Sequence, residues 1–351
     1  MTTTDQPVWL QAVKFSLGNW RISILLLVPG AVVLEAFHAP PLAIFGAAAL
    51  ALVPLASLLG SATEELSGHV GAALGGFLNA TLGNATELII AFLALRSGHI
   101  EVVKASITGS IIGNLLLVFG LAVLCGGVGR EKQTFNRTAI GANTSMLFLA
   151  VVALVMPAIF DLAVFGRLEA TGETIERLSF WTAVVLLLSY FASLVFTFRT
   201  HKDVFRGGGH HAPTLPRRAA IAILVVATVL IAVASEILVG QIEFVTKSLG
   251  WTELFVGLVI VATVGNAAEH STAVLVARKD QMDLALNIAV GSSTQIALFV
   301  APLLVVASQF MAAPMSLVFH PLEIAAVILS VGVVTLVSQD GETNWFEGLQ
   351  L

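Results

Sequence analysis

Ten apolar segments, each close to the length of a membrane-crossing helix, constrain the fold of this 351-residue chain more than any other feature. About 20 apolar residues span a bilayer as a helix, because a segment in lipid must satisfy its own backbone hydrogen bonds. Only 11% of the residues are charged, against about 25% in a soluble domain, so a soluble globule is excluded. We therefore predict an all-α polytopic membrane protein. The segments are at 22–37, 42–60, 72–95, 104–127, 139–160, 179–199, 218–239, 253–277, 284–308 and 317–338.

Basic residues in the predicted loops indicate the orientation. Loops on the side of the amino terminus, called side A, contain twelve Lys and Arg residues, whereas loops on the opposite side B contain five. Cytoplasmic loops carry the excess of basic residues, so side A is predicted to be cytoplasmic. We expect an integral protein of a bacterial inner (plasma) membrane with its amino terminus in the cytoplasm. The five basic residues assigned to side B are Arg96, Lys104, Arg167, Arg177 and Lys247.

The longest polar connector, residues 200–217, divides the chain near its middle and falls on side A. Its three consecutive glycines and two prolines predict a flexible cytoplasmic linker. His210 and His211 within it have no further ligands at a fixed spacing. We therefore interpret them as solvated loop residues rather than as a metal site.

A sequence repeat relates the two halves of the chain. Residues 83–87 (GNATE) return as residues 265–269 (GNAAE), 182 positions later. The same offset carries Arg96 onto Arg278, and it carries the Gly-Ser pair at 109–110 onto the pair at 291–292. Polar residues and glycines that match at one offset indicate a duplication, because apolar helices alone would match only in their aliphatic residues.

Five predicted helices separate equivalent points of the two copies, so the second copy enters the membrane upside down. Inverted repeats are typical of secondary transporters, which bind substrate at the repeat interface near mid-membrane. A partner for the span at 179–199 would lie beyond Leu351, so we expect repeat 2 to have four helices and its last helix to be missing. The predicted parts are an extra amino-terminal helix, repeat 1, the linker and repeat 2, at 1–41, 42–199, 200–217 and 218–351.

Two glutamates, Glu87 and Glu269, lie inside predicted spans at equivalent repeat positions. A charge at the centre of a membrane helix costs roughly 2.5–3.5 kcal/mol on insertion scales, so the recurrence indicates a function. A Gly-Asn pair precedes each glutamate by one turn, and a helix that unwinds there would free backbone carbonyl oxygens. Inverted repeats would bring both glutamates around one cavity. Carboxylate, carbonyl and amide oxygens are hard ligands, which suit Ca²⁺ better than softer metals.

A pair of carboxylates also accounts for coupling to protons. Two carboxylates that lie close together in a low dielectric cannot both ionise cheaply. A divalent cation stabilises the ionised pair and protons neutralise it, so the two ions compete for one site. This competition is sufficient for exchange if the empty, charged site cannot easily reorient.

Polar residues in the following spans face one way, because Ser110 and Asn114 are four apart and Ser292 and Gln295 are three apart. We interpret the glycines at 109, 113 and 291 as helix-packing positions and His270 as a packing or outer residue. Acidic residues Glu64 and Glu236 either line ion access on opposite sides or sit at the membrane interface. The predicted site-lining or supporting residues are Gly83, Asn84, Gly265, Asn266, Ser110, Asn114, Ser292 and Gln295.

These motifs resemble those of the Ca²⁺/cation–proton exchanger (CAX) family of the cation/Ca²⁺ exchanger superfamily. The resemblance implies one extra helix followed by two inverted five-helix repeats, with Glu87 and Glu269 taking cation and proton in turn. Many members carry an acidic stretch between the halves, whereas residues 200–217 are basic. The matching segments are GNATELIIA (83–91), TGSIIGN (108–114), GNAAEH (265–270) and GSSTQIAL (291–298).

The sequence therefore predicts a secondary active Ca²⁺/H⁺ antiporter that exports Ca²⁺ by alternating access. An antiporter of the same fold that exchanges Na⁺, K⁺ or Mn²⁺ for H⁺ stays open. A sodium-driven exchanger is less favoured because no second ligand set is apparent, and a channel is less favoured because its pore usually needs several subunits. The chain has no P-loop, HExxH or GxSxG motif, so we expect no enzyme. We expect no resident cofactor and no nucleic-acid partner, and a homo-oligomer is left open.

Overall fold

The computed structural model describes residues 22–70, 72–166, 172–200 and 213–351. Each of the ten predicted apolar segments forms helix within these residues. Among the described residues, six helices are long and apolar enough to cross a membrane, or up to eight if each of two bent helix pairs is one span. The first and tenth predicted spans form shorter apolar helices. His210, His211 and the basic residues of 1–21 lie outside the described residues.

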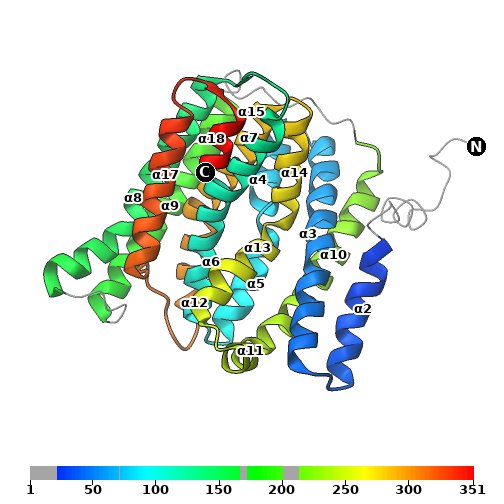
Figure 1. Cartoon of the computed structure of the whole chain (residues 1–351). Helices are drawn as coiled ribbons and strands as arrows, with labels where there is room; N and C mark the ends of the chain where they lie inside the picture. Colours follow the sequence, from blue (N-terminus) through cyan, green and yellow to red (C-terminus); the bar gives the residue numbers. More distant parts are fainter. Residues whose placement is uncertain (1–21, 71, 167–171, 201–212) are drawn as a thin grey trace, which may run out of the picture.

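The helices of repeat 1 run alternately between the two ends of the bundle (Figure 1). The peripheral helix α2 (Ile22–Ala36) precedes them, and α3 is about ten residues longer than its predicted span. In order, repeat 1 contains α3 (Pro41–Val70), α4 (Ala72–Leu82), α5 (Ala85–Arg96), α6 (Ile100–Ile112), the π-helix η3 (Gly113–Val118), α7 (Phe119–Gly127), α8 (Arg137–Phe165), α9 (Glu173–Val195) and the π-helix η4 (Phe196–Thr200).

Repeat 2 repeats this order from the opposite end of the bundle. The offset of 182 residues pairs α14 with α5, η6 with η3 and α16 with α7. The short α18 packs on α7 as α9 packs on α16. The elements are α10 (Arg217–Gly240), α11 (Ile242–Leu249), α12 (Glu253–Phe255), the π-helix η5 (Val256–Val261), α13 (Ala262–Gly265), α14 (Ala267–Arg278), α15 (Met282–Gln295), the π-helix η6 (Ile296–Val300), α16 (Ala301–Ser308), α17 (Pro321–Val337) and α18 (Trp345–Gln350).

Polar caps begin several helices where the chain re-enters the apolar layer. The Asn136 side chain accepts backbone N–H groups at the start of α8. Capping boxes begin α17, through His320 and Glu323, and α18, through Asn344 and Glu347. These side chains satisfy amide groups that have no partner within the first turn and that lipid cannot bind.

Two loops on side A are joined by a short antiparallel ladder that the sequence did not predict. Strand β1 (Gln133–Thr134) pairs with β2 (Glu342–Thr343). Beside it, Lys132 Nζ donates a hydrogen bond to Glu342 Oε1 at 2.7 Å, which raises the pKa of Lys132 above its ordinary value. The ladder joins the loop after α7 to the loop before α18, so it ties the two repeats together at this end.

Lys104 departs most clearly from the predicted loops. We assigned it to a loop on side B, but it is buried in α6 and its Nζ donates to the Val318 carbonyl at 2.9 Å. One turn later, the Thr108 hydroxyl donates to Glu323 Oε1 at 2.5 Å. The assignment was wrong because the segment between α16 and α17 folds over α6 and offers polar partners. Without Lys104, the side A loops still carry more basic residues than the side B loops, so side A stays the predicted cytoplasmic side.

Candidate cation site between the repeats

The two helices that carry Glu87 and Glu269 are each interrupted shortly before the glutamate. Helix α4 ends at Leu82 and α5 begins at Ala85, with a bend of 43° between them. In repeat 2, α13 ends at Gly265 and α14 begins after Asn266. The predicted interruptions are confirmed, as expected for glycine and asparagine in a helix. Each glutamate consequently lies in the first turn of its helix, at the centre of the bundle.

The asparagine at each break is held by side chains of the opposite repeat. Asn84 Nδ2 donates to Gln295 Oε1 at 2.5 Å, and Asn84 Oδ1 accepts from the Ser292 hydroxyl at 3.2 Å. Asn84 is completely buried. The break in repeat 1 is therefore anchored to α15 of repeat 2.

The second asparagine repeats this arrangement. Asn266 Nδ2 donates to Ser110 Oγ at 2.8 Å, and Asn266 Oδ1 accepts from Asn114 Nδ2 at 3.1 Å. Gln295 lies one position before the equivalent of Asn114, and its extra methylene extends its reach. We call the two sets the Asn–Ser–amide triads: Asn84, Ser292 and Gln295, and Asn266, Ser110 and Asn114. They bring together six of the eight residues that the sequence predicted to line or support the site.

A π-helix coincides with the amide residue in both repeats. Asn114 lies within η3, and η6 begins directly after Gln295. Short π segments within α-helices are rare and frequently occur at functional sites. Their recurrence at equivalent positions indicates that the wider turn belongs to the site. The sequence analysis missed them because an apolar span has the same composition whether its turns are α or π.

The side chain of Glu87 lies against the helix break of repeat 2. A Cβ atom at Gly265 would lie 3.0 Å from Glu87 Cγ, so the glycine makes room for this side chain. The carboxyl groups of Glu87 and Glu269 are close enough for their charges to interact. Within the described part of the chain, a Cβ added at Gly83 would meet only the Asn79 backbone, so the two breaks are not equivalent in this structure.

Three buried acceptor oxygens at this centre have no hydrogen-bond partner within the described residues: Glu87 Oε2, Glu269 Oε2 and Asn114 Oδ1. Buried polar atoms in proteins are rarely left unpaired. Oxygens of this kind can bind protons or a hard cation, and Ca²⁺ takes six to eight oxygen ligands, which include backbone carbonyls and water. In the part of the chain that is described, no three His, Cys, Asp or Glu side chains gather, so the donor set is mostly amide, hydroxyl and backbone oxygen around two carboxylates.

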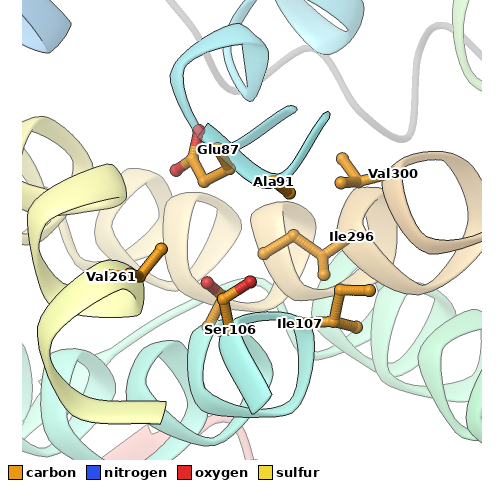
Figure 2. A pocket seen from close by; sticks show the side chains of 8 residues that line it. Glu87, Ala91, Ser106, Ile107, Val261, Ile296 and Val300 are labelled. Carbon is orange, nitrogen blue, oxygen red and sulfur yellow. The ribbon is translucent and has the colours of Figure 1, made fainter. Parts of the chain in front are cut away.

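A narrow cavity of about 10 Å³, close to the space that one water molecule needs, lies beside Glu87 (Figure 2). Figure 2 shows Glu87 and Ala91 on one wall and Ser106 on the facing wall, with aliphatic side chains around them. The remaining lining residues are Ile107, Ser110, Val261, Ile296 and Val300.

The two halves of the bundle are packed differently on sides A and B. On side B, α6 and η5 touch closely, since a Cβ at Gly109 would lie 2.7 Å from Leu258 Cα and a Cβ at Gly257 would lie 2.7 Å from Ala105 Cβ. Gly291, the repeat equivalent of Gly109, has nothing within 4 Å of an added Cβ. The close contact at Gly109 on side B therefore has no counterpart at Gly291 in this structure. The predicted packing is confirmed for Gly109, whereas Gly291 and Gly113 have open space in this structure.

The two candidate access residues lie toward opposite ends of the bundle. Glu64 is exposed on α3 near side A, and Glu236 is exposed on α10 near side B. Glu236 Oε1 lies 3.5 Å from Arg96 Nη2, so it forms a surface ion pair. Neither residue lines the cavity beside Glu87. His270, next to Glu269, has a buried Nε2 atom without a hydrogen-bond partner within the described residues.

Glu65 is a polar anchor whose partners the sequence could not identify. Its buried carboxylate accepts hydrogen bonds from the Thr214 amide at 2.8 Å, the Thr214 hydroxyl at 2.6 Å and the Leu215 amide at 3.0 Å. Glu65 therefore attaches the end of the linker to α3.

Comparisons with known proteins agree with this architecture. A family model described as sodium/calcium exchanger protein matches residues 40–199 and 219–351. The Ca²⁺/H⁺ antiporter of Aphanothece halophytica is 44% identical over 342 residues, which cover 93% of this chain and 91% of the relative. The Ca²⁺/H⁺ antiporter ChaA of Bacillus subtilis is 40% identical over 331 residues, which cover 92% and 93%.

Solved structures show the same fold. The structure of native YfkE is similar with a TM-score of 0.81 and 40% identity, and the match covers 94% of each chain. The crystal structure of an H⁺/Ca²⁺ exchanger CAX gives a TM-score of 0.70 at 15% identity over 94% of this chain and 84% of that chain, and it supports the fold alone. This chain therefore belongs to the sodium/calcium exchanger protein family and, within it, to the Ca²⁺/cation–proton exchangers.

Proposed function

We propose that this protein is a secondary active antiporter that exports Ca²⁺ in exchange for H⁺. The observation that carries the proposal is the pair Glu87 and Glu269, contributed by opposite inverted repeats, with one unpaired buried oxygen each. The printed names of the relatives from Aphanothece halophytica and Bacillus subtilis support Ca²⁺ and H⁺ as the exchanged ions.

In this mechanism Ca²⁺ and protons occupy the same carboxyl groups in turn. Ca²⁺ binds when both glutamates are ionised, because a divalent cation offsets two negative charges that otherwise repel each other in a low dielectric. Protons release the cation by neutralising the same groups. An empty site with two buried charges is costly, so the protein changes conformation only when it is loaded with either ion.

The Asn–Ser–amide triads hold the two helix breaks in position around the ion. Asn84 and Asn266 have both their amide nitrogen and their amide oxygen engaged in hydrogen bonds, so their part is to orient the backbone at the breaks. Asn114 keeps a free Oδ1 and is the amide that contributes a ligand. Gly83 and Gly265 supply backbone carbonyls at the edge of the site.

Alternating access follows from the unequal packing of the two repeats. The tight contact between α6 and η5 closes side B, and the looser surroundings of Gly291 belong to side A. In the opposite conformation, side A closes by the equivalent contact and side B opens. Glu64 and Glu236 would then serve ion entry from sides A and B.

The repeats in this proposal occupy residues 42–199 and 218–351, with an extra helix in 1–41 and the cytoplasmic linker in 200–217. The protein lies in a bacterial inner membrane with its amino terminus in the cytoplasm. It acts as a transporter rather than as an enzyme, and Ca²⁺ is its cargo, not a resident cofactor.

Transport in everted membrane vesicles tests the proposal. An imposed pH gradient, acidic inside, should drive Ca²⁺ uptake, and collapse of the gradient should stop it. Glu87→Gln and Glu269→Gln should each abolish uptake at equal membrane levels, whereas Glu173→Gln, at an exposed surface position, should not. Uptake that persists without the gradient would contradict antiport. Stronger competition by Na⁺, K⁺ or Mn²⁺ than by unlabelled Ca²⁺ would reassign the cargo.

A further inference from the structure

The cavity beside Glu87 contains a hydroxyl that belongs to neither triad. Its polar lining consists of Glu87, Ser110 and Ser106, and the other walls are aliphatic. Ser106 is buried, with 6% of its surface exposed, and Figure 2 shows it across the cavity from Glu87 and Ala91. Ser106 therefore contributes a polar group to the wall of the cavity beside Glu87.

The lining residues show that the cavity leads from the site toward side B. Helix α6 begins on side B, so Ser106 lies one turn nearer that side than Ser110. Helix α5 runs toward side B, so Ala91 lies one turn beyond Glu87. One turn corresponds to about 6 Å along a helix axis for four residues. An ion that moves between Glu87 and side B would therefore pass Ser106.

The hydrogen bonding of Ser106 suits a cation. Its Oγ donates to the Val103 carbonyl at 2.8 Å, which occupies the only proton of the hydroxyl group. The two lone pairs of the oxygen remain, so the group can act as an acceptor toward the cavity. An oxygen acceptor is a hard ligand of the kind that Ca²⁺ and its bound water use.

The repeat does not require a hydroxyl at this position. The equivalent of Ser106 in repeat 2 is Ile288, which is apolar. The triad residues recur in both repeats, whereas the hydroxyl of Ser106 occurs only in repeat 1, between the glutamate pair and side B. This difference separates Ser106 from the symmetric residues that orient the helix breaks.

We propose that Ser106 coordinates the partly hydrated divalent cation between the glutamate pair and side B, and that it determines cation affinity from that side only. This inference rests on the proposed function. Ser106→Ala should raise the KM for Ca²⁺ presented on side B about threefold to tenfold, as the loss of one oxygen ligand would. The KM for Ca²⁺ presented on side A should stay within twofold of wild type.

The experiment measures Ca²⁺ exchange in right-side-out and everted vesicles, which present side B and side A to the medium. Ser106→Thr, which keeps the hydroxyl, should retain the wild-type KM. Ser330→Ala is the matched control, because Ser330 is a buried serine of α17 that donates to its own helix at 2.7 Å and does not line the cavity. Ser106→Cys gives the same test if the alanine variant does not reach the membrane, since a thiol is a poor ligand for a hard cation.

A KM that rises equally on both sides, or that is unchanged on side B, would overturn the assignment. An equal effect of Ser106→Thr and Ser106→Ala would also overturn it. Glu87→Gln is measured in the same vesicles: if it still transports Ca²⁺, the proposed function fails. If it is inactive while Ser106→Ala keeps the wild-type KM, only the role of Ser106 is removed.

Discussion

A methyl group added at Gly109 should favour opening of the bundle on side B. The Cβ of Gly109→Ala would lie 2.7 Å from Leu258 Cα, against about 3.4 Å for an ordinary contact. The obstructing atoms belong to the backbone of η5, so no rotamer change can relieve the clash, and α6 and η5 must separate by at least 0.7 Å. Overpacking of this kind costs roughly 1–3 kcal/mol. The cost applies only while α6 and η5 touch, so it destabilises the conformation that is closed on side B.

This energy corresponds to a shift of about 5- to 150-fold in the equilibrium between the two conformations. The chain has one cysteine, so Cys125→Ser followed by Ala91→Cys places a single thiol in the cavity. Gly109→Ala should accelerate labelling of this thiol by a membrane-impermeant reagent on side B by a comparable factor. Gly291→Ala is the matched comparison: it has open space in the described conformation but would clash in the equivalent contact that closes side A, so it should slow this labelling rather than accelerate it.

Unchanged labelling in Gly109→Ala would refute the argument that the contact between α6 and η5 closes side B. An equal acceleration by Gly291→Ala would refute it as well, because that glycine has open space in the described conformation.

Two further predictions concern hydrogen bonds. Asn84→Ala leaves Gln295 and Ser292 without their hydrogen-bond partner, so transport per inserted molecule should fall at least tenfold in the vesicle assay. Asn143→Ala is the control, because it removes the hydrogen bond between Asn143 of α8 and Asn287 of α15, outside the site, and it should retain transport in the same assay. Lys104→Met removes the hydrogen-bond donor to the Val318 carbonyl and should lower the free energy of unfolding of the purified protein by about 1–3 kcal/mol. The thermal unfolding midpoint should fall while transport changes little. A midpoint equal to that of the wild type would contradict this prediction.

The sequence was sufficient to predict the helices and their inverted arrangement, because apolar length and a repeat at one offset are local signals. It also identified the triad residues, since Ser110 and Asn114, or Ser292 and Gln295, share one face of a helix. The pairing of each triad with the opposite asparagine follows from the inversion, and only the structure gives its partners and distances.

Other features depended on contacts that no local pattern encodes. Lys104 follows a short polar stretch and resembles a loop residue, but a segment more than 200 residues away supplies its acceptor. Gly109 and Gly291 are equivalent in sequence, yet only one is in close contact, because a single conformation breaks the symmetry of the repeats. The role of Ser106 emerged only from the cavity, since one serine in an apolar span carries no signal by itself.

Proton release on Ca²⁺ binding tests the central claim that both ions share Glu87 and Glu269. Ca²⁺ added to purified protein in weakly buffered detergent solution near neutral pH should displace protons from the wild type. The double variant Glu87→Gln/Glu269→Gln should bind no Ca²⁺ and release no protons. Ca²⁺ binding by the wild type without proton release, or equal release from the double variant, would contradict the account.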